Sequence, residues 1–272
     1  MADNVITCSL VISTYNWSKA LDFSLQCVLR QTVMPNEIVI ADDGSTEETA
    51  ELIERFKNIS PIPIIHIWQE DKGFRKSKIL NKAIMAASHK YIIQIDGDIL
   101  IDPNFIKDHL WIAKENYYVR GSRALLDTTV TEFLLKDKIV PPVTILAKLS
   151  RHKLNALRNL TIARFLSDKY KVRGKERYNM NGCNMAFWKD DFIEINGYNE
   201  AFVGWGCEDV EFAMRLNKSG KTKQSLKMAG VAFHLSHPLN SRKNFNINNL
   251  ILEQSIQHNY HKCLYGIYKL NA

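Results

Sequence analysis

The sequence predicts an α/β fold in which helices flank a mostly parallel central sheet. Short β-branched apolar runs alternate with helical segments of about a dozen residues through the first hundred residues, as in consecutive βαβ units. Each apolar run stops at a cluster of polar residues, which is typical of parallel strands that end at a functional edge. A length of 272 residues suits one compact body with a single sizeable core.

The elements of this alternation follow one another up to residue 100. A buried strand is expected at 6–13, because this run is apolar and β-branched and then gives way to Thr14-Tyr15-Asn16. Further strands are expected at 37–41, 62–68 and 91–95, with helices at 18–30, 46–56 and 76–87. Beyond residue 100 the alternation is lost, Pro141-Pro142 interrupts the pattern, and a helical tail is expected from Asn248.

The composition is that of an ordinary globular protein, with 46% hydrophobic and 24% charged residues. Five scattered cysteines, none in a Cys-x-x-Cys pair, argue against a disulfide framework and against a structural zinc site. No run approaches the roughly 18 apolar residues that span a bilayer, and the N-terminus lacks the pattern of a signal peptide. We therefore expect a cytoplasmic protein whose membrane contact, if any, is peripheral.

Acidic side chains follow two of the expected strands. Asp96 and Asp98 lie on the same side of an extended segment, and Gly97 between them allows a ligand to approach closely, which suits a divalent cation that bridges a diphosphate. In the Asp42-Asp43 turn, one carboxylate is expected to close an Asx-turn, which leaves the other to accept the imide N–H of a uracil ring.

The segment 73–78 combines one glycine with three cations just before a helix. Arg75 and Lys78 are candidates for binding phosphate oxygens at this helix N-terminus, and a solvated loop is an equally good interpretation.

The most specific motif is Gly204-Trp205-Gly206-Cys207-Glu208-Asp209, which runs into a helical segment. Two acids at a helix start could merely complement the helix dipole. The flexible Gly-Trp-Gly, however, is a natural device for stacking on a sugar and closing over it, and a carboxylate desolvated beside the ring would have its pKa raised toward that of a general base. Downstream, one of His234 and His237 is expected to supply nitrogen to the metal.

With these residues the chain resembles family 2 glycosyltransferases of the GT-A (Rossmann-like) fold that carry a galactosyltransferase-type C-terminal half. The C-terminal motifs, 181–186 and 204–209, are similar to those of β-1,4-galactosyltransferase and bacterial chondroitin polymerase domains, and the likeness covers most of residues 5 to 240. It implies a nucleotide-sugar-binding half at 1–100, an acceptor-binding and catalytic half at 101–240 that includes a basic helical segment at 146–177, and a helical tail at 241–272.

The resemblance also implies roles for single residues. In the first half, Ser13, Tyr15 and Asp43 would hold the uridine, Asp96 would lie near the ribose and the metal, and Asp98 would bind the metal. In the second half, Asp209 would be the catalytic base, Glu208 a contact to the acceptor or the donor sugar, and His234 the metal ligand, with Asn181, Trp205 and Gly206 contacting substrate. Cys207 stands where relatives often carry glycine, and no methionine precedes His234 at the spacing seen in some galactosyltransferases, so His237 stays open as the ligand.

The function expected from this resemblance is inverting transfer of a hexose or N-acetylhexosamine, with galactose favoured, from a UDP-sugar to a hydroxyl of a bacterial surface glycan. We expect Mn²⁺, or else Mg²⁺, as the metal. A sugar-nucleotide nucleotidyltransferase is the nearest rival, but it would need a glycine-rich basic loop where this chain has Thr14-Tyr15-Asn16-Trp17. A basic nucleic-acid-binding protein would leave 204–209 unexplained, and no nucleic-acid partner is expected.

The net charge of +7 is concentrated in one segment, since residues 148–177 contain ten Lys or Arg against Asp168 and Glu176, a net of +8. Leucines interleave with these cations at close to helical spacing. We expect an amphipathic basic helix that contacts an anionic membrane surface at the inner face and so reaches a lipid-linked glycan acceptor. An insertion whose apolar face packs on the core, with merely solvated charges, is equally compatible with the pattern.

Overall fold

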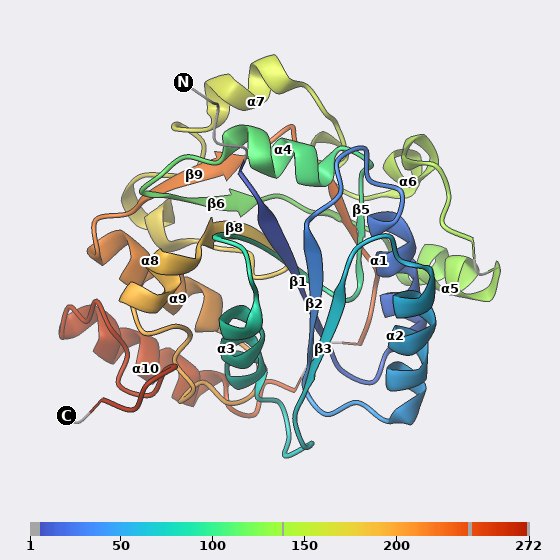
Figure 1. Cartoon of the computed structure of the whole chain (residues 1–272). Helices are drawn as coiled ribbons and strands as arrows, with labels where there is room; N and C mark the ends of the chain where they lie inside the picture. The colour runs from blue at the N-terminus through green and yellow to red at the C-terminus, as the bar shows by residue number, and fades with distance from the viewer. Residues whose placement is uncertain (1–5, 138, 239–240, 271–272) are drawn as a thin grey trace.

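A seven-stranded sheet with helices on both faces forms the body of the protein (Figure 1). The computed structural model describes residues 6–137, 139–238 and 241–270. The strand order is β3-β2-β1-β4-β8-β6-β9, and the strands are β1 (Cys8–Thr14), β2 (Glu37–Asp42), β3 (Ile64–Trp68), β4 (Tyr91–Asp96), β6 (Tyr117–Gly121), β8 (Asn184–Trp188) and β9 (Thr222–Leu226). A second sheet has the order β5-β10-β7, from β5 (Ile99–Ile101), β10 (Ala232–His234) and β7 (Ala124–Leu125).

Ten α-helices and two short 3-10 helices are present in the described ranges. They are α1 (Ser18–Val28), α2 (Glu47–Ile59), α3 (Lys76–Ala86), α4 (Phe105–Ile112), α5 (Thr128–Asp137), α6 (Val143–Leu149), η1 (Lys153–Asn155), α7 (Leu160–Leu166), η2 (Gly174–Tyr178), α8 (Lys189–Glu194), α9 (Glu208–Lys218) and α10 (Phe245–Gln257). No helix in the described ranges is both long enough and apolar enough to cross a membrane.

The predicted α/β fold is confirmed. The strands expected near residues 6, 37, 62 and 91 are β1 to β4, and β1 pairs in parallel with both β2 and β4. The helices expected near residues 18, 46 and 76 are α1, α2 and α3. The apolar runs are good predictors here because these strands are covered on both faces, so nearly every position in them must be apolar.

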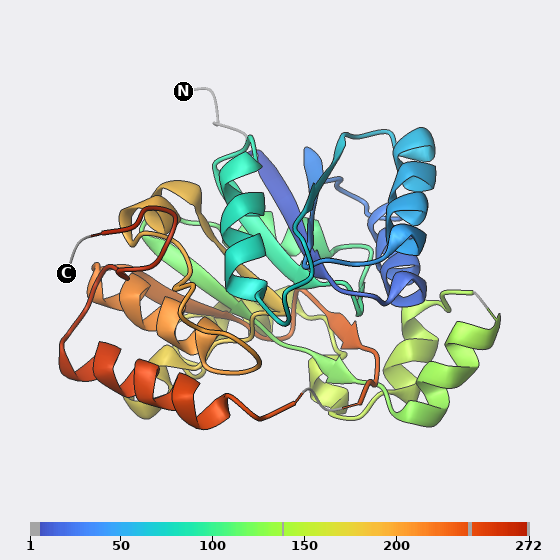
Figure 2. The same ribbon diagram turned by 90° about the horizontal axis from the view of Figure 1, so that it is seen from below.

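Alternate residues of the strands feed two separate cores. Leu10 and Ile12 of β1 lie in the core beneath α1, α2 and α4, whereas Val11 lies in the core beneath α3, α8 and α9. Figure 2 shows the first strands between α3 on one face and α1 and α2 on the other. This packing fixes the sheet, and with it the positions of the loops that leave its edge.

Strand β8 runs against its neighbours. It pairs antiparallel with β4, where Ile93 lies opposite Ala186, and antiparallel with β6, where Val119 lies opposite the same residue. The start of β8 therefore lies at the edge where β4 and β6 end. Residues 181–183, just before β8, are brought in this way to the carboxyl ends of the parallel strands.

The basic segment is not the single helix that its periodicity predicts. It is broken into α6, η1 and α7, because Arg151 pairs with Leu125 of β7 through an N–H···O bond of 2.7 Å and His152 has a left-handed φ of 58°. Leu146 is buried in the core, as an insertion packed on the core would require. Other apolar side chains of the segment are exposed, namely Leu149, Leu154, Leu157, Ile162 and Phe165.

Candidate active site

The carboxyl ends of β1 and β4 are joined by hydrogen bonds to Asp96. Ser13 Oγ donates to Asp96 Oδ1 over 2.7 Å, and Lys76 Nζ at the start of α3 donates to the same oxygen over 2.5 Å. Burial raises the pKa of Asp96, but Lys76 and Ser13 outweigh it and hold the pKa below its ordinary value. Asp96 is thus an ionised carboxylate in an ion pair.

Asp98 meets two histidines. His234 Nε2 lies 3.7 Å from Asp98 Oδ1 and His237 Nε2 lies 3.5 Å from Oδ2, so the ligand atoms of all three residues fall within 4.8 Å of one another. Both rings can donate Nδ1–H to a backbone oxygen, of Leu235 over 2.6 Å and of Pro238 over 2.7 Å. That tautomer leaves each Nε2 lone pair facing Asp98, as in imidazole ligands of metals.

The donor set of this cluster fits a divalent cation. Asp98 Oδ1 is buried and has no hydrogen-bond partner among the described residues, and an unpaired buried carboxylate oxygen is costly. Burial raises the pKa of Asp98, which His234 opposes. One carboxylate with two imidazoles suits Mn²⁺ better than Mg²⁺, which demands oxygen ligands. The sequence left His234 and His237 as alternatives, whereas the structure brings both to Asp98. Asp96 lies outside this cluster, and its Oδ1 accepts from Ser13 and Lys76 instead.

The residues expected to hold uridine lie at the carboxyl ends of β1 and β2. Asp42 Oδ1 closes the predicted Asx-turn by accepting from Ser45 N over 2.8 Å. Asp43 is not free as expected, because its oxygens accept from Gln69 Nε2 over 2.6 Å and from the backbone N–H of Arg75 over 2.7 Å. Each of its oxygens keeps a second lone pair for a ligand. Burial raises the pKa of Asp43, and these two bonds lower it only in part.

The other residues of this side are arranged less tightly. Tyr15 is exposed, and its hydroxyl donates to Asp71 over 2.9 Å. The Arg75 guanidinium donates to the backbone oxygen of Glu70, and Lys78 lies half-buried in the first turn of α3. Neither cationic side chain makes a hydrogen bond to another candidate site residue among those described.

Glu208 and Asp209 begin α9 and face the segment before β8. Asp209 Oδ2 accepts from Gly182 N over 3.0 Å and its Oδ1 from Val210 N over 2.8 Å, so the carboxylate is fixed in orientation. Gln94 of β4 donates to Gly182 O over 2.9 Å and holds this segment against the sheet. Burial raises the pKa of Asp209, and the Gly182 bond opposes it.

Glu208 is the more strongly perturbed acid. Burial, aided by the neighbouring Asp209 carboxylate and opposed by Lys76, raises the pKa of Glu208 to about 7. Its side chain makes no hydrogen bond among the described residues. The Lys76 ammonium thus faces acids of both halves of the chain, Asp96 and Glu208, which also raise the pKa of Lys76.

The loop before this acid pair has strained backbone. Gly206 has φ +112°, and Cys207 has φ 73°, a left-handed conformation that costs a residue with a side chain but not glycine. This explains why glycine suits the position of Cys207. Trp205 is 38% exposed and stacks on Phe245 of α10, with ring centroids 5.9 Å apart. Asn181 donates to Gly121 O over 3.0 Å, so it fixes the end of β6 to the segment before β8.

Two cations near these acids were not singled out from the sequence. Lys76 is one of the three cations of the loop 73–78, and only the docking of α3 on the sheet shows that it reaches Asp96. Arg123 follows β6 and donates to Cys183 Sγ over 2.9 Å. Burial raises the pKa of the Cys183 thiol to about 11, so Arg123 faces a neutral thiol. No sequence signal marks Arg123 as part of the site.

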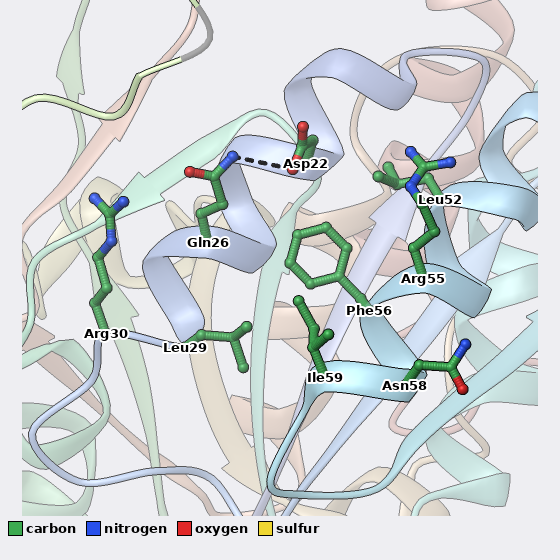
Figure 3. A pocket seen from close by; sticks show the side chains of 9 residues that line it. All are labelled: Asp22, Gln26, Leu29, Arg30, Leu52, Arg55, Phe56, Asn58 and Ile59. Carbon is green, nitrogen blue, oxygen red and sulfur yellow. Dashed lines mark hydrogen bonds between the residues drawn. The ribbon is translucent and has the colours of Figure 1, made fainter.

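A groove lies away from these groups. It measures about 660 Å³ and is lined by residues of α1 and α2, with Leu29, Leu52, Phe56 and Ile59 on its apolar walls (Figure 3). Its polar rim includes Gln26, which donates to Asp22 over 3.0 Å. Helices α1 and α2 start at the carboxyl ends of the strands that precede them. The groove reaches the final turns of both helices, so it extends toward the opposite edge of the sheet.

Comparison with solved structures identifies the fold. TarS of S. aureus (residues 1–349) matches with a TM-score of 0.65 at 16% identity, over 92% of this chain and 65% of that one. A mannosyltransferase from Pyrobaculum calidifontis, in complex with GDP-Man and Mn²⁺, matches with a TM-score of 0.60 at 17% identity, over 92% and 64%. The fold is therefore that of a GT-A glycosyltransferase.

The sequence comparisons name the family. Residues 9–189 match the model of glycosyl transferase family 2, and residues 163–238 match that of the N-terminal domain of galactosyltransferase. The chain belongs to glycosyl transferase family 2. It is 26% identical to chondroitin synthase of Escherichia coli over 93% of its length, and 27% identical to validoxylamine A glucosyltransferase of Streptomyces hygroscopicus subsp. limoneus over 78%. It spans only 39% and 48% of these two relatives.

Proposed function

We propose that this glycosyltransferase moves a hexose or N-acetylhexosamine from a UDP-sugar to a hydroxyl of a glycan, with inversion at the anomeric carbon. The observation that carries the proposal is the placing of two acidic groups at one sheet edge. Asp98 with its two histidines follows β4, and the Glu208-Asp209 pair faces the same edge through Gly182. An inverting transfer needs these two functions, stabilisation of the leaving group and a base.

Asp98, His234 and His237 would hold the divalent cation, with Mn²⁺ preferred. When bound, such an ion supplies positive charge that stabilises the departing UDP. The Mn²⁺ in the P. calidifontis mannosyltransferase supports a metal in this fold.

The chain's own residues would perform the remaining steps. Asp209, oriented by Gly182 N–H, would take the proton of the attacking hydroxyl. Glu208 would contact the donor sugar or the acceptor, and Lys76 would keep the paired acids from repelling the diphosphate. On the donor side Asp43 would accept the uracil imide N–H, next to Ser13 and Tyr15. Trp205 with Gly206 would stack on a sugar ring and limit water, with Asn181 lining the acceptor side.

The choice of donor rests on related proteins. Structures of TarS with UDP and with UDP-GlcNAc support a uridine donor. The match of residues 163–238 to a galactosyltransferase domain supports a galactose-type sugar.

A donor screen tests the proposal. UDP release would be measured with UDP-galactose, UDP-glucose and their N-acetyl forms, with Mn²⁺, in the presence of mixed glycan acceptors. We expect release from at least one donor by the wild type and none above background by Asp98→Ala. Absence of release from every UDP-sugar, with GDP-mannose turned over instead, would refute the uridine assignment.

We also propose that part of the basic segment, residues 146–166, contacts an anionic membrane and so holds the enzyme at the surface that carries a lipid-linked acceptor. Exposed Leu154 and Phe165 lie among its cations, and each cation near such a surface adds about 1 kcal/mol of attraction. In Figure 1, α7 lies beside α4 at the end of the sheet where β1 begins, away from the carboxyl edge. Co-sedimentation with anionic vesicles at low but not high salt is expected, and equal pelleting with neutral vesicles would refute it.

A further inference from the structure

Two buried hydrogen-bond donors without acceptors lie side by side on β6 and β9. Arg120 is only 8% exposed, yet its Nε has no partner among the described residues, and the hydroxyl of Ser225, fully buried, has none either. The parallel register places Arg120 directly opposite Ser225, so both side chains lie on the same face of the sheet. A buried guanidinium without an acceptor is costly, which points to an absent anionic partner.

More cations surround this pair. Lys227 Nζ lies 5.6 Å and Lys171 Nζ 5.8 Å from the ring centroid of Tyr170, and the Lys227 ammonium also donates to Asn155 Oδ1. Lys223, two residues before Ser225, donates to the backbone oxygens of Glu176 and Asn179 over 2.6 and 2.7 Å.

The charges of this group are not balanced. The Glu176 carboxylate lies 3.9 Å from Lys171 Nζ. Burial, together with the nearby Arg120 charge, lowers the pKa of Lys223 to about 8. The same repulsion from Arg120 acts on Lys227, whose pKa is also below its ordinary value, mainly through burial. One anion at this place would relieve these repulsions.

The group lies next to the acceptor side of the active site. Gly121, which follows Arg120, accepts a hydrogen bond from Asn181 through its backbone oxygen. Gly182, which follows Asn181, donates its backbone N–H to Asp209. In the sheet, β8 lies between β4 and β6. Asp98 follows β4, the segment that bonds Asp209 precedes β8, and Arg120 lies on β6, so Arg120 is one strand further from Asp98 than that segment. An anion bound at Arg120 would therefore belong to the acceptor rather than to the donor diphosphate.

We propose that Arg120 and Ser225, with Lys171 and Lys227, bind an anionic oxyacid group of the acceptor glycan, a carboxylate or a phosphodiester, and so select acidic acceptors. The assignment to the acceptor rests on the proposed transferase function, whereas binding of the anion does not. Arginine suits this role because its planar fork matches a carboxylate or phosphate with two parallel bonds.

Calorimetry without donor tests the binding. The probes are a glucuronate-ended tetrasaccharide, the same tetrasaccharide with its carboxylates reduced to alcohols, and a glycerol phosphate oligomer. We expect one anionic probe to bind at least about tenfold more tightly than the reduced one, with Arg120→Gln abolishing that preference. Whichever anionic probe binds more tightly identifies the group as carboxylate or phosphodiester. Ser225→Ala, which removes only a hydroxyl, should weaken the preferred probe several-fold and serves if Arg120→Gln does not fold.

Arg173→Gln is the matched control, because Arg173 is an exposed cation of the same segment and its loss should change affinity by less than about twofold. Equal binding of acidic and reduced probes to the wild type, or an equal loss in Arg173→Gln and Arg120→Gln, would overturn the site.

Hydrolysis of the UDP-sugar without acceptor separates this inference from the proposed function. We expect Arg120→Gln to keep the wild-type rate. Loss of hydrolysis in this variant, with its fold intact, would make Arg120 a donor residue and overturn its assignment to the acceptor. A wild type that turns over no donor would refute the transferase function but leave the calorimetric result standing.

Discussion

Replacing Asp209 with asparagine tests the proposed base and has two separable effects. Both carboxylate oxygens accept backbone N–H groups, from Gly182 over 3.0 Å and from Val210 over 2.8 Å. An amide offers only one oxygen, so its NH₂ must face one of these donors and leave it unpaired. An unsatisfied donor of this kind costs about 1–3 kcal/mol of unfolding free energy. For a domain of this size that is a fall of about 2–4 °C in Tm per kcal/mol.

The catalytic effect should be larger than the structural one. Loss of a general base typically lowers turnover by about 10²–10⁴-fold, so we expect kcat of Asp209→Asn to fall at least about a hundredfold while donor binding survives. The assay is UDP release at saturating donor and acceptor, well below the Tm of the variant, with donor affinity measured separately by calorimetry.

Glu208→Gln is the matched control for this experiment. The Glu208 side chain makes no hydrogen bond among the described residues, so its amide should not lower the Tm through a lost backbone bond. We expect this variant to raise the KM for a substrate more than it lowers kcat. If Asp209→Asn turns over like the wild type while Glu208→Gln is inactive, the reasoning is refuted and Glu208, with its pKa of about 7, is the base.

Three further predictions concern the metal, the pH dependence and the core. Excess EDTA should abolish transfer, and His234→Ala and His237→Ala should each weaken Mn²⁺ binding by at least about tenfold; wild-type Mn²⁺ affinity in His237→Ala by calorimetry would remove that residue from the site. Because burial raises the folded pKa of Glu208 from 4.5 to about 7, metal-free protein should lose stability as the pH rises through this window, and Glu208→Gln should not; parallel curves of Tm against pH would contradict this. Arg215 and Glu211 form a fully buried ion pair with two hydrogen bonds of 2.7 Å. Arg215→Met should therefore lower the free energy of unfolding in urea by about 3–5 kcal/mol, and adding Glu211→Leu should recover part of it. A loss below about 1 kcal/mol would show that the Glu211 charge is neutralised in another way.

The sequence predicts those parts of the molecule that depend on local pattern. The first four strands and three helices follow from apolar periodicity, since both faces of β1 and β2 are buried. The acids at the strand ends follow from topology alone, because parallel strands present their carboxyl ends at one edge. His234 and His237 could be proposed as ligands from residue type, but that both reach Asp98 depends on the pairing of β10 with β5, more than a hundred residues apart.

Long-range contacts account for what the sequence does not predict. The bonds from Gln69 and Arg75 to Asp43 depend on how the loop after β3 folds back on β2. The helical periodicity of the basic segment continues through residues 150–152, where the bridge between Arg151 and Leu125 and the left-handed backbone of His152 interrupt the helix. Arg120 carries no signal at all, because a single arginine in a strand reveals neither its burial nor its missing partner.

Because β8 runs antiparallel to its neighbours, the residues of the candidate active site are held in two different ways. Groups assigned to the donor follow the ends of β1, β2 and β4, so they are tied to the framework of the sheet. The segment 178–183 instead enters the site before its strand begins, and it is anchored there by Asn181 and Gly182. Changes in its composition or length can therefore alter what is offered to Asp209 without moving Asp96 or Asp98. If the proposed roles hold, a new acceptor could be acquired by replacing one short connection, while the residues assigned to the sugar nucleotide stay unchanged.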